Sequence, residues 1–283
     1  MLGDSSMVFA RYYFKSKIIQ TMPVLILVLS AFNVSPAFAG ISNISDAINK
    51  AGRQRMLTQR MYKAYCMIGL DVQTDDAREQ LNAAVTLFDK QLQELIAYSP
   101  TQKIFSALQK VESLWRPFRK TITGDVEVKT AEMLLKANDN LLRQTHEVVL
   151  LLEDFSGSEL GRLVNIAGRQ RMLSQRLAKF YVLRAWGVDN ARIRNEMERA
   201  KNEFKSALSE LSAAKENTAG IKQALVKANG DWLLLKHGLE RNNKKMVPLI
   251  VAMTSEKLLK SMNEITAMYA ALPVEVNTTK RQN

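Results

Sequence analysis

Apolar residues recur three or four positions apart along most of this chain, with charged and amide side chains between them. Leu81, Val85, Phe88, Leu92 and Leu95 form one such series. This spacing is that of amphipathic helices, whereas the alternation typical of a β-strand is confined to the short stretch 125–128. The pattern therefore predicts an all-α fold.

Helix-breaking residues divide the pattern into eight segments. Ser99-Pro100 ends one predicted helix, and Asn242-Asn243 follows another. Pro117 falls late in a helix and is expected to kink or end it. Pro248 suits a first helical turn. The expected helices are 42–70, 74–98, 101–121, 127–154, 158–187, 190–215, 219–241 and 246–271.

A ten-residue segment occurs twice. Ala51–Arg60, AGRQRMLTQR, returns 116 positions later as Ala167–Arg176, AGRQRMLSQR, with a single change of Thr to Ser. Other apolar positions repeat at similar offsets, so the chain is expected to contain two copies of one unit. We expect two tandem antiparallel four-helix bundles, at 40–155 and 156–273. At Ser156-Gly157-Ser158 the chain either continues as one long helix or bends as a hinge.

The two ends of the chain differ from the rest. Residues 1–39 have a basic start, an apolar run and the small-residue site Ala37-Phe38-Ala39, the arrangement of a secretory signal peptide. Cleavage there would place the protein in the periplasm. The alternative is an uncleaved helix that anchors it in the inner membrane. Residues 274–283 are expected to form a disordered tail.

Composition excludes several classes of function. A formal net charge of +12 favours anionic partners. Nucleic acid is disfavoured because the chain is expected to be exported and has no basic block with interleaved aromatics. Cys66 is the only cysteine, so it forms no intrachain disulfide and is expected to be buried. His146 and His237 lack partners at metal-ligand spacing. We therefore expect no metal, no cofactor and no enzymatic activity.

The repeated segment carries the candidate chemistry. A helical wheel places Arg55 and Thr58 on the same apolar stripe as Ile41, Ile44 and Ile48, while a second stripe faces the bundle. In the second copy Arg171 and Ser174 occupy the corresponding positions. A helix with two apolar faces is expected to pack on two sides.

A guanidinium on an apolar stripe needs a partner, and no Asp or Glu lies one turn away in either copy. A planar oxyanion would match the arginine fork. Thr58, Gln59, Ser174 and Gln175 would add neutral donors. Gly52 and Gly168 would allow a partner helix to approach closely.

A simpler interpretation treats the segment as a tight helix crossing whose arginines extend to solvent. Arg53 and Arg60 are expected to behave in this way, or to bind acidic residues elsewhere. The stripe position of Arg55 and Arg171 favours the anion instead.

Asn49–Arg60 and Asn165–Arg176 share the pattern Asn-x-Ala-Gly-x-x-Arg-Met-x-Ser-x-Arg, with Thr58 as the one departure. The pattern resembles the P-box of NarX-type nitrate/nitrite sensor kinases and the N-terminal periplasmic domain of PilJ-type chemotaxis transducers. The resemblance implies a four-helix bundle with the motif on its first helix. It also implies that two such helices meet and that Arg55 and Arg171 bind nitrate. Unlike those receptors, this chain carries two boxes.

Two functions remain open from the sequence. The first is a soluble periplasmic sensory or binding protein for a small oxyanion, nitrate or nitrite, held between Arg55 and Arg171. The two boxes would meet within one chain or across a homodimer, and a membrane receptor, sensor kinase or pilus component would respond. The second is a helical interaction module without a ligand, which docks a pilus or chemoreceptor component.

Overall fold

The structure is a computed structural model that describes residues 40–240 and 247–273. These residues belong to one compact unit, Ala39–Asn283. The predicted signal peptide, 1–39, and the predicted tail, 274–283, lie outside the described residues.

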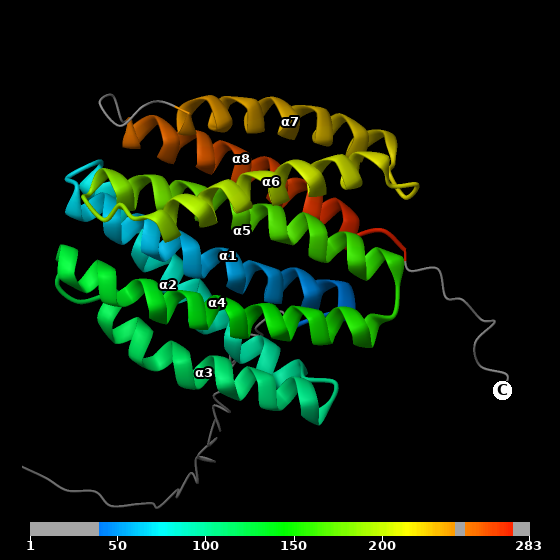
Figure 1. Ribbon diagram of the computed structural model, residues 1–283. Coiled ribbons are helices and arrows are strands. Elements are labelled where there is room, and N and C mark those ends of the chain that lie inside the picture. The colour runs from blue at the N-terminus through cyan, green and yellow to red at the C-terminus, as the bar shows by residue number, and fades with distance from the viewer. Residues whose placement is uncertain (1–39, 241–246, 274–283) are drawn as a thin grey trace, which may run out of the picture. The chain divides into compact units, whose positions relative to one another are not determined.

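The described residues form helices joined by short loops (Figure 1). No β-strand occurs in them, and 125–127 form a loop before the fourth helix, so the all-α prediction is confirmed. Every helix end lies within two residues of its predicted position. The helices are α1 (Ile44–Gly69), α2 (Thr74–Tyr98), α3 (Gln102–Ile122), α4 (Val128–Ser156), α5 (Glu159–Ala185), α6 (Ala191–Ala213), α7 (Ala219–Leu239) and α8 (Pro248–Ala270).

Local capping explains several of these boundaries. The side chains of Asn43, Thr101, Ser158, Asn190 and Thr218 each accept a hydrogen bond from a backbone N–H in the first turn that follows. Such caps satisfy donors that the helix itself leaves unpaired.

Pro117 does not end α3, which continues to Ile122. Phe118 and Ile122, the apolar residues beyond the proline, are buried and hold this last turn against the core.

The junction between the repeats is a hinge and not a continuous helix. α4 ends at Ser156, and Gly157 adopts φ 56°, in the left-handed region that favours glycine. The Gly157 N–H donates to the carbonyls of Glu153 and Asp154. Ser158 then caps α5 by accepting from the Gly161 N–H at 3.0 Å. The turn brings α5 back beside the first repeat.

α1 and α5 form the most extensive helix–helix contact in the described structure. α1 also packs on α2 and α4, and α5 on α6 and α8. α3 packs mainly on α4, and α7 mainly on α8 (Figure 1). Nineteen of the 26 residues of α1 are buried, against eight of 25 in α2, which identifies α1 as central. The expectation that this helix packs on two sides is confirmed, and the second side is the equivalent helix of the other repeat.

None of the helices in 40–240 and 247–273 is both long and apolar enough to cross a membrane.

Replacement of Gly157 tests the hinge. Gly157→Ala is expected to lower the free energy of unfolding by about 1 kcal/mol, because alanine is strained at positive φ. Gly230 is the matched control, since it lies within α7 and has open space beside its Cα. Gly230→Ala is expected to raise that free energy by about 1 kcal/mol through helix propensity. Urea denaturation measures both, and equal effects of the two changes would contradict the hinge.

Candidate functional site

The two copies of the repeated motif meet where α1 crosses α5. A Cβ atom added to Gly52 would lie 3.8 Å from the Cα of Gly168. It would also lie 3.2 Å from Nη2 of Arg171 and 3.4 Å from Nη2 of Arg55. A Cβ on Gly168 would meet the same two nitrogens at 3.1 and 3.5 Å. Both guanidinium groups therefore fill the space that the two glycines leave open.

Arg55 reaches across the crossing to the other copy of the motif. Its side chain is buried, with 1% of the residue exposed. Nη2 donates to the Asn165 side-chain oxygen at 2.7 Å and to the Asn165 carbonyl at 3.3 Å. Nη1 donates to Nδ1 of His146 at 3.0 Å. Because guanidinium has no acceptor, this bond places the imidazole proton on Nε2.

Arg171 makes the reciprocal contacts. Its Nη1 donates to the Asn49 side-chain oxygen at 2.9 Å and to that of Asn263 at 3.3 Å. Its Nη2 donates to the Asn49 carbonyl at 3.0 Å. Each arginine thus binds the first asparagine of the opposite motif, in a pseudo-twofold arrangement.

The charges of the two arginines are not cancelled by direct ion pairs. Among the described residues, no carboxylate lies within 4 Å of either guanidinium, and the Nε of each has no hydrogen-bond partner. Burial, followed by the nearby charge of Arg169, lowers the pKa of Arg55 to about 9. Burial, followed by the charges of Arg53 and Arg55, also lowers the pKa of Arg171. The crossing therefore holds two buried cations whose acceptors are neutral.

The hydroxyls of the motif point elsewhere. Thr58 donates to the carbonyl of Arg55 at 2.8 Å, and Ser174 donates to that of Arg171 at the same distance. These bonds lie within each helix, so the hydroxyl hydrogens face backbone oxygens and not the space between the guanidiniums.

The glutamines after these hydroxyls tie the central helices to α4 and α8. Nε2 of Gln59 donates to Asn138 at 3.0 Å, and Nε2 of Gln175 donates to the Ser255 carbonyl at 3.2 Å. The structure therefore brings Arg55, Arg171, Gly52 and Gly168 together and leaves the four predicted neutral donors outside the crossing.

Four residues at the crossing were not predicted as site residues. Asn49 and Asn165 belong to the repeated motif, and that repetition was a usable signal. His146 and Asn263 lie 117 positions apart on α4 and α8, at corresponding places in the two repeats. No local sequence pattern marks them, because their role depends on how α4 and α8 pack on the central helices.

Two buried lysines, also one repeat apart, were missed too. Nζ of Lys63 lies 2.5 Å from Glu256, which also binds Arg60 at 2.7 Å. Lys179 instead donates to Asn138 at 3.1 Å and lies over the Phe180 ring, 4.2 Å from its centre. Burial lowers the pKa of Lys179 to about 7. The two repeats therefore stabilise the corresponding buried lysine by different contacts, a carboxylate for Lys63 and an amide oxygen with an aromatic ring for Lys179.

Cys66 is a free, fully buried thiol whose pKa burial raises. This agrees with its predicted place in the core and is unlike a reactive thiol.

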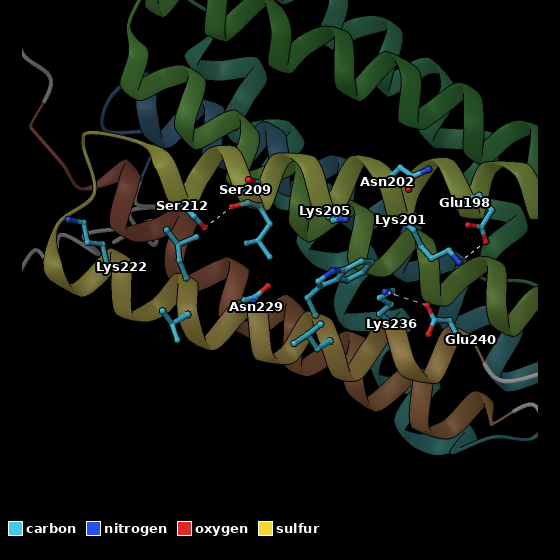
Figure 2. A pocket seen from close by; sticks show the side chains of 15 residues that line it. Glu198, Lys201, Asn202, Lys205, Ser209, Ser212, Lys222, Asn229, Lys236 and Glu240 are labelled. Carbon is cyan, nitrogen blue, oxygen red and sulfur yellow. Dashed lines mark hydrogen bonds and ion pairs between the residues drawn. The ribbon is translucent and has the colours of Figure 1, made fainter.

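A groove of about 780 Å³ lies between α6 and α7 (Figure 2). Trp232 is among the residues that line it. Lys201 and Lys205 from α6 and Lys222 and Lys236 from α7 also line it. The corresponding hollow between α2 and α3, about 750 Å³, contains Trp115. There Nε1 of Trp115 donates to Asp89 at 2.6 Å. The position of Asp89 corresponds to that of Lys205, so the two grooves differ in charge.

His146 provides a pH test of the crossing. Burial and the charge of Arg55 lower its pKa from 6.5 to about 4. Below pH 6.5 the unfolded chain therefore binds a proton that the folded chain does not, and the free energy of unfolding falls as pH falls towards 4. His146→Asn, which copies Asn263, is expected to remove about 1–2 kcal/mol of the loss between pH 7 and 4.5. Urea denaturation at both pH values measures this, and an unchanged loss would contradict the assigned contact.

Comparison with known proteins agrees with the two-repeat organisation. Residues 37–146 and 156–248 each match the family described as "Type IV pili methyl-accepting chemotaxis transducer N-term". No curated protein and no solved structure matches the chain. The two matches together cover more than half of the sequence, and each contains one copy of the repeated motif. This family consists of sensory domains that are not catalytic. The chain belongs to the PilJ family, the N-terminal domains of type IV pili methyl-accepting chemotaxis transducers, and is a sensory signal-transduction module.

Proposed function

We propose that this sensory module binds a small planar oxyanion, nitrate or nitrite, where α1 crosses α5. One observation carries the proposal: Arg55 and Arg171 are buried beside the same pair of glycines and neither has a carboxylate partner. The resemblance of both motif copies to the P-box of NarX-type sensors supports the choice of anion.

The electrostatics favour an added anion. Asn49 and Asn165 orient the guanidiniums with neutral oxygens, which leaves the mutual repulsion of the two cations in place. An oxyanion near both would reduce that repulsion and accept from N–H groups that remain free, including the two Nε–H groups.

The position of the crossing suits a sensor. α1 and α5 belong to different repeats, so an anion held between their arginines would change how the two repeats pack. A membrane receptor, sensor kinase or pilus component would then detect the change. In this proposal residues 1–39 direct export to the periplasm, and the site needs only one chain because both motif copies are in it.

Nitrate titration calorimetry tests the site. The wild-type protein is expected to bind nitrate, and Arg55→Gln and Arg171→Gln are each expected to weaken binding by about tenfold or more, as for the loss of a charged hydrogen bond. Arg116→Gln is the matched control, because that side chain is 75% exposed on α3. Absence of nitrate binding, or unchanged binding in both Gln variants, would refute the proposal.

Asn49→Asp adds a test that does not remove a buried cation. It would place a carboxylate beside Nη1 of Arg171, where the amide oxygen now lies at 2.9 Å. This internal anion is expected to raise the melting temperature and weaken nitrate binding. A higher melting temperature with unchanged nitrate affinity would contradict the role of Arg171.

A second candidate function, docking of a partner protein, rests on the groove between α6 and α7. Val226 and Leu233 in its lining are 76% and 56% exposed. The corresponding positions in the first repeat hold Gln109 and Arg116. Val226, Leu233 and Lys205 together would suit an apolar, acidic helix of a receptor or pilus component.

Photo-crosslinking in cells tests the groove. A photoreactive residue at 226 is expected to give a crosslinked product that the same residue at 109 does not give. Lys205→Asp, which copies Asp89 of the first repeat, is expected to reduce that product severalfold by reversing the charge. Gel electrophoresis with mass spectrometry provides the measurement. Equal yields from 226 and 109 would count against docking.

A further inference from the structure

A cavity of about 380 Å³ lies between α4, α5 and α6, on one side of the crossing. Its lining is dominated by guanidinium groups. The arginines that line it are Arg55, Arg143, Arg169, Arg176, Arg192 and Arg199. Because α4 belongs to the first repeat and α5 and α6 to the second, the cavity lies between the repeats.

The carboxylates in the lining are already engaged. Asp139 binds Arg192 at 2.8 Å, and Glu203 binds Arg169 at 2.9 Å. Glu196 is shared between Arg176 at 2.7 Å and Arg199 at 3.1 Å. These are the three acidic residues of the lining.

Positive charge therefore remains in excess. Within the described part of the chain, neither Arg55 nor Arg143 has a carboxylate within 4 Å. The six arginines and three carboxylates leave a net charge of three positive units. A monovalent anion such as nitrate would balance only part of this charge.

His146 adds a neutral donor to the same lining. Its Nδ1 accepts from Arg55, so its Nε2 carries the proton. The fall of the His146 pKa to about 4 keeps the ring neutral near pH 7. An anion that accepts from Nε2 would be connected through the ring to the buried guanidinium of Arg55.

The other repeat shows that the common fold does not require these arginines. At the positions that correspond to Arg192 and Arg199, α2 carries Asp76 and Ala83. Both arginines are more than 60% exposed, at 64% and 69%. Arg192 and Arg199 are therefore specific to the second repeat and are not required for helix packing.

We infer that this cavity binds a small organic or inorganic anion that carries two or more negative charges on carboxylate or phosphate groups. Its volume lies within the range of small-molecule sites. Arginine forks on separate helices are suited to several oxyanion groups at once, each held by paired N–H donors. The ligand would contact Arg143 of α4 and Arg199 of α6 and so link the two repeats. This site adjoins the nitrate site proposed at the crossing, because Arg55 lines both, but it differs from that site in using Arg143 and Arg199.

Calorimetry with a series of anions tests the inference. Citrate is expected to bind at least tenfold more tightly than acetate, with succinate between them. Pyrophosphate in a parallel titration distinguishes a phosphate ligand from a carboxylate ligand. The class of anion that binds with the higher affinity is the one that the cavity prefers. Equal affinity for citrate, pyrophosphate and acetate, or no binding of any of them, would overturn the inference.

Variants locate the binding. Arg143→Gln with Arg199→Ala is expected to weaken binding of the preferred polyanion about tenfold or more. The matched control, Arg116→Ala with Arg78→Ala, removes two arginines of the first repeat that lie outside this lining and is expected to leave affinity unchanged. Circular dichroism melting verifies that all variants are folded. Equal affinity in the test and control pairs would refute the assigned site.

Two further readouts separate this site from the crossing. The polyanion is expected to shift the His146 Nε2 resonance in ¹⁵N NMR of the wild-type protein, whereas acetate at the same ionic strength is not. Nitrate binding at the crossing is expected to persist in the Arg143→Gln/Arg199→Ala variant, so either site can fail alone. An unmoved His146 resonance at saturating polyanion would contradict the cavity as the binding place.

Discussion

The close contact of α1 with α5 is the constraint on which the described structure depends. Two glycines allow these helices to approach, and two arginines occupy the space beside them. Burial of two like charges opposes folding, and each guanidinium is stabilised mainly by the amide oxygen and carbonyl of an asparagine on the opposite helix. The other helices pack around this pair. The two buried charges therefore lie at the contact between the two repeats.

Duplication within one chain has allowed the two halves of a symmetric arrangement to diverge. His146 occupies the place of Asn263, and Lys179 lacks the direct carboxylate contact that Glu256 gives to Lys63. The grooves and cavities on the outer helices differ in the same way. A homodimer built from one such unit would contain every residue twice. This chain can instead place a neutral donor, an arginine cluster or an apolar edge in one repeat only.

The sequence predicted the helices well because each depends on local signals. Apolar spacing, capping side chains and breakers lie within a few residues of the boundaries that they determine. Pro117 lies inside α3 and does not end it, because Phe118 and Ile122 beyond the proline are buried in the core. The glycine–arginine core of the candidate site was equally accessible, because the repeat isolates it from the diverged sequence around it.

Side-chain direction and long-range partners were decided only by the tertiary structure. The sequence by itself determined an all-α chain of two repeats and identified Arg55 and Arg171 as cations on an apolar stripe. It did not determine that Thr58 and Gln59 turn away from the crossing, that Ser156-Gly157-Ser158 bends, or that His146 and Asn263 complete the arginine contacts. Helical periodicity specifies which face of a helix is buried, but only the packing of helices distant in the sequence specifies which atoms meet there.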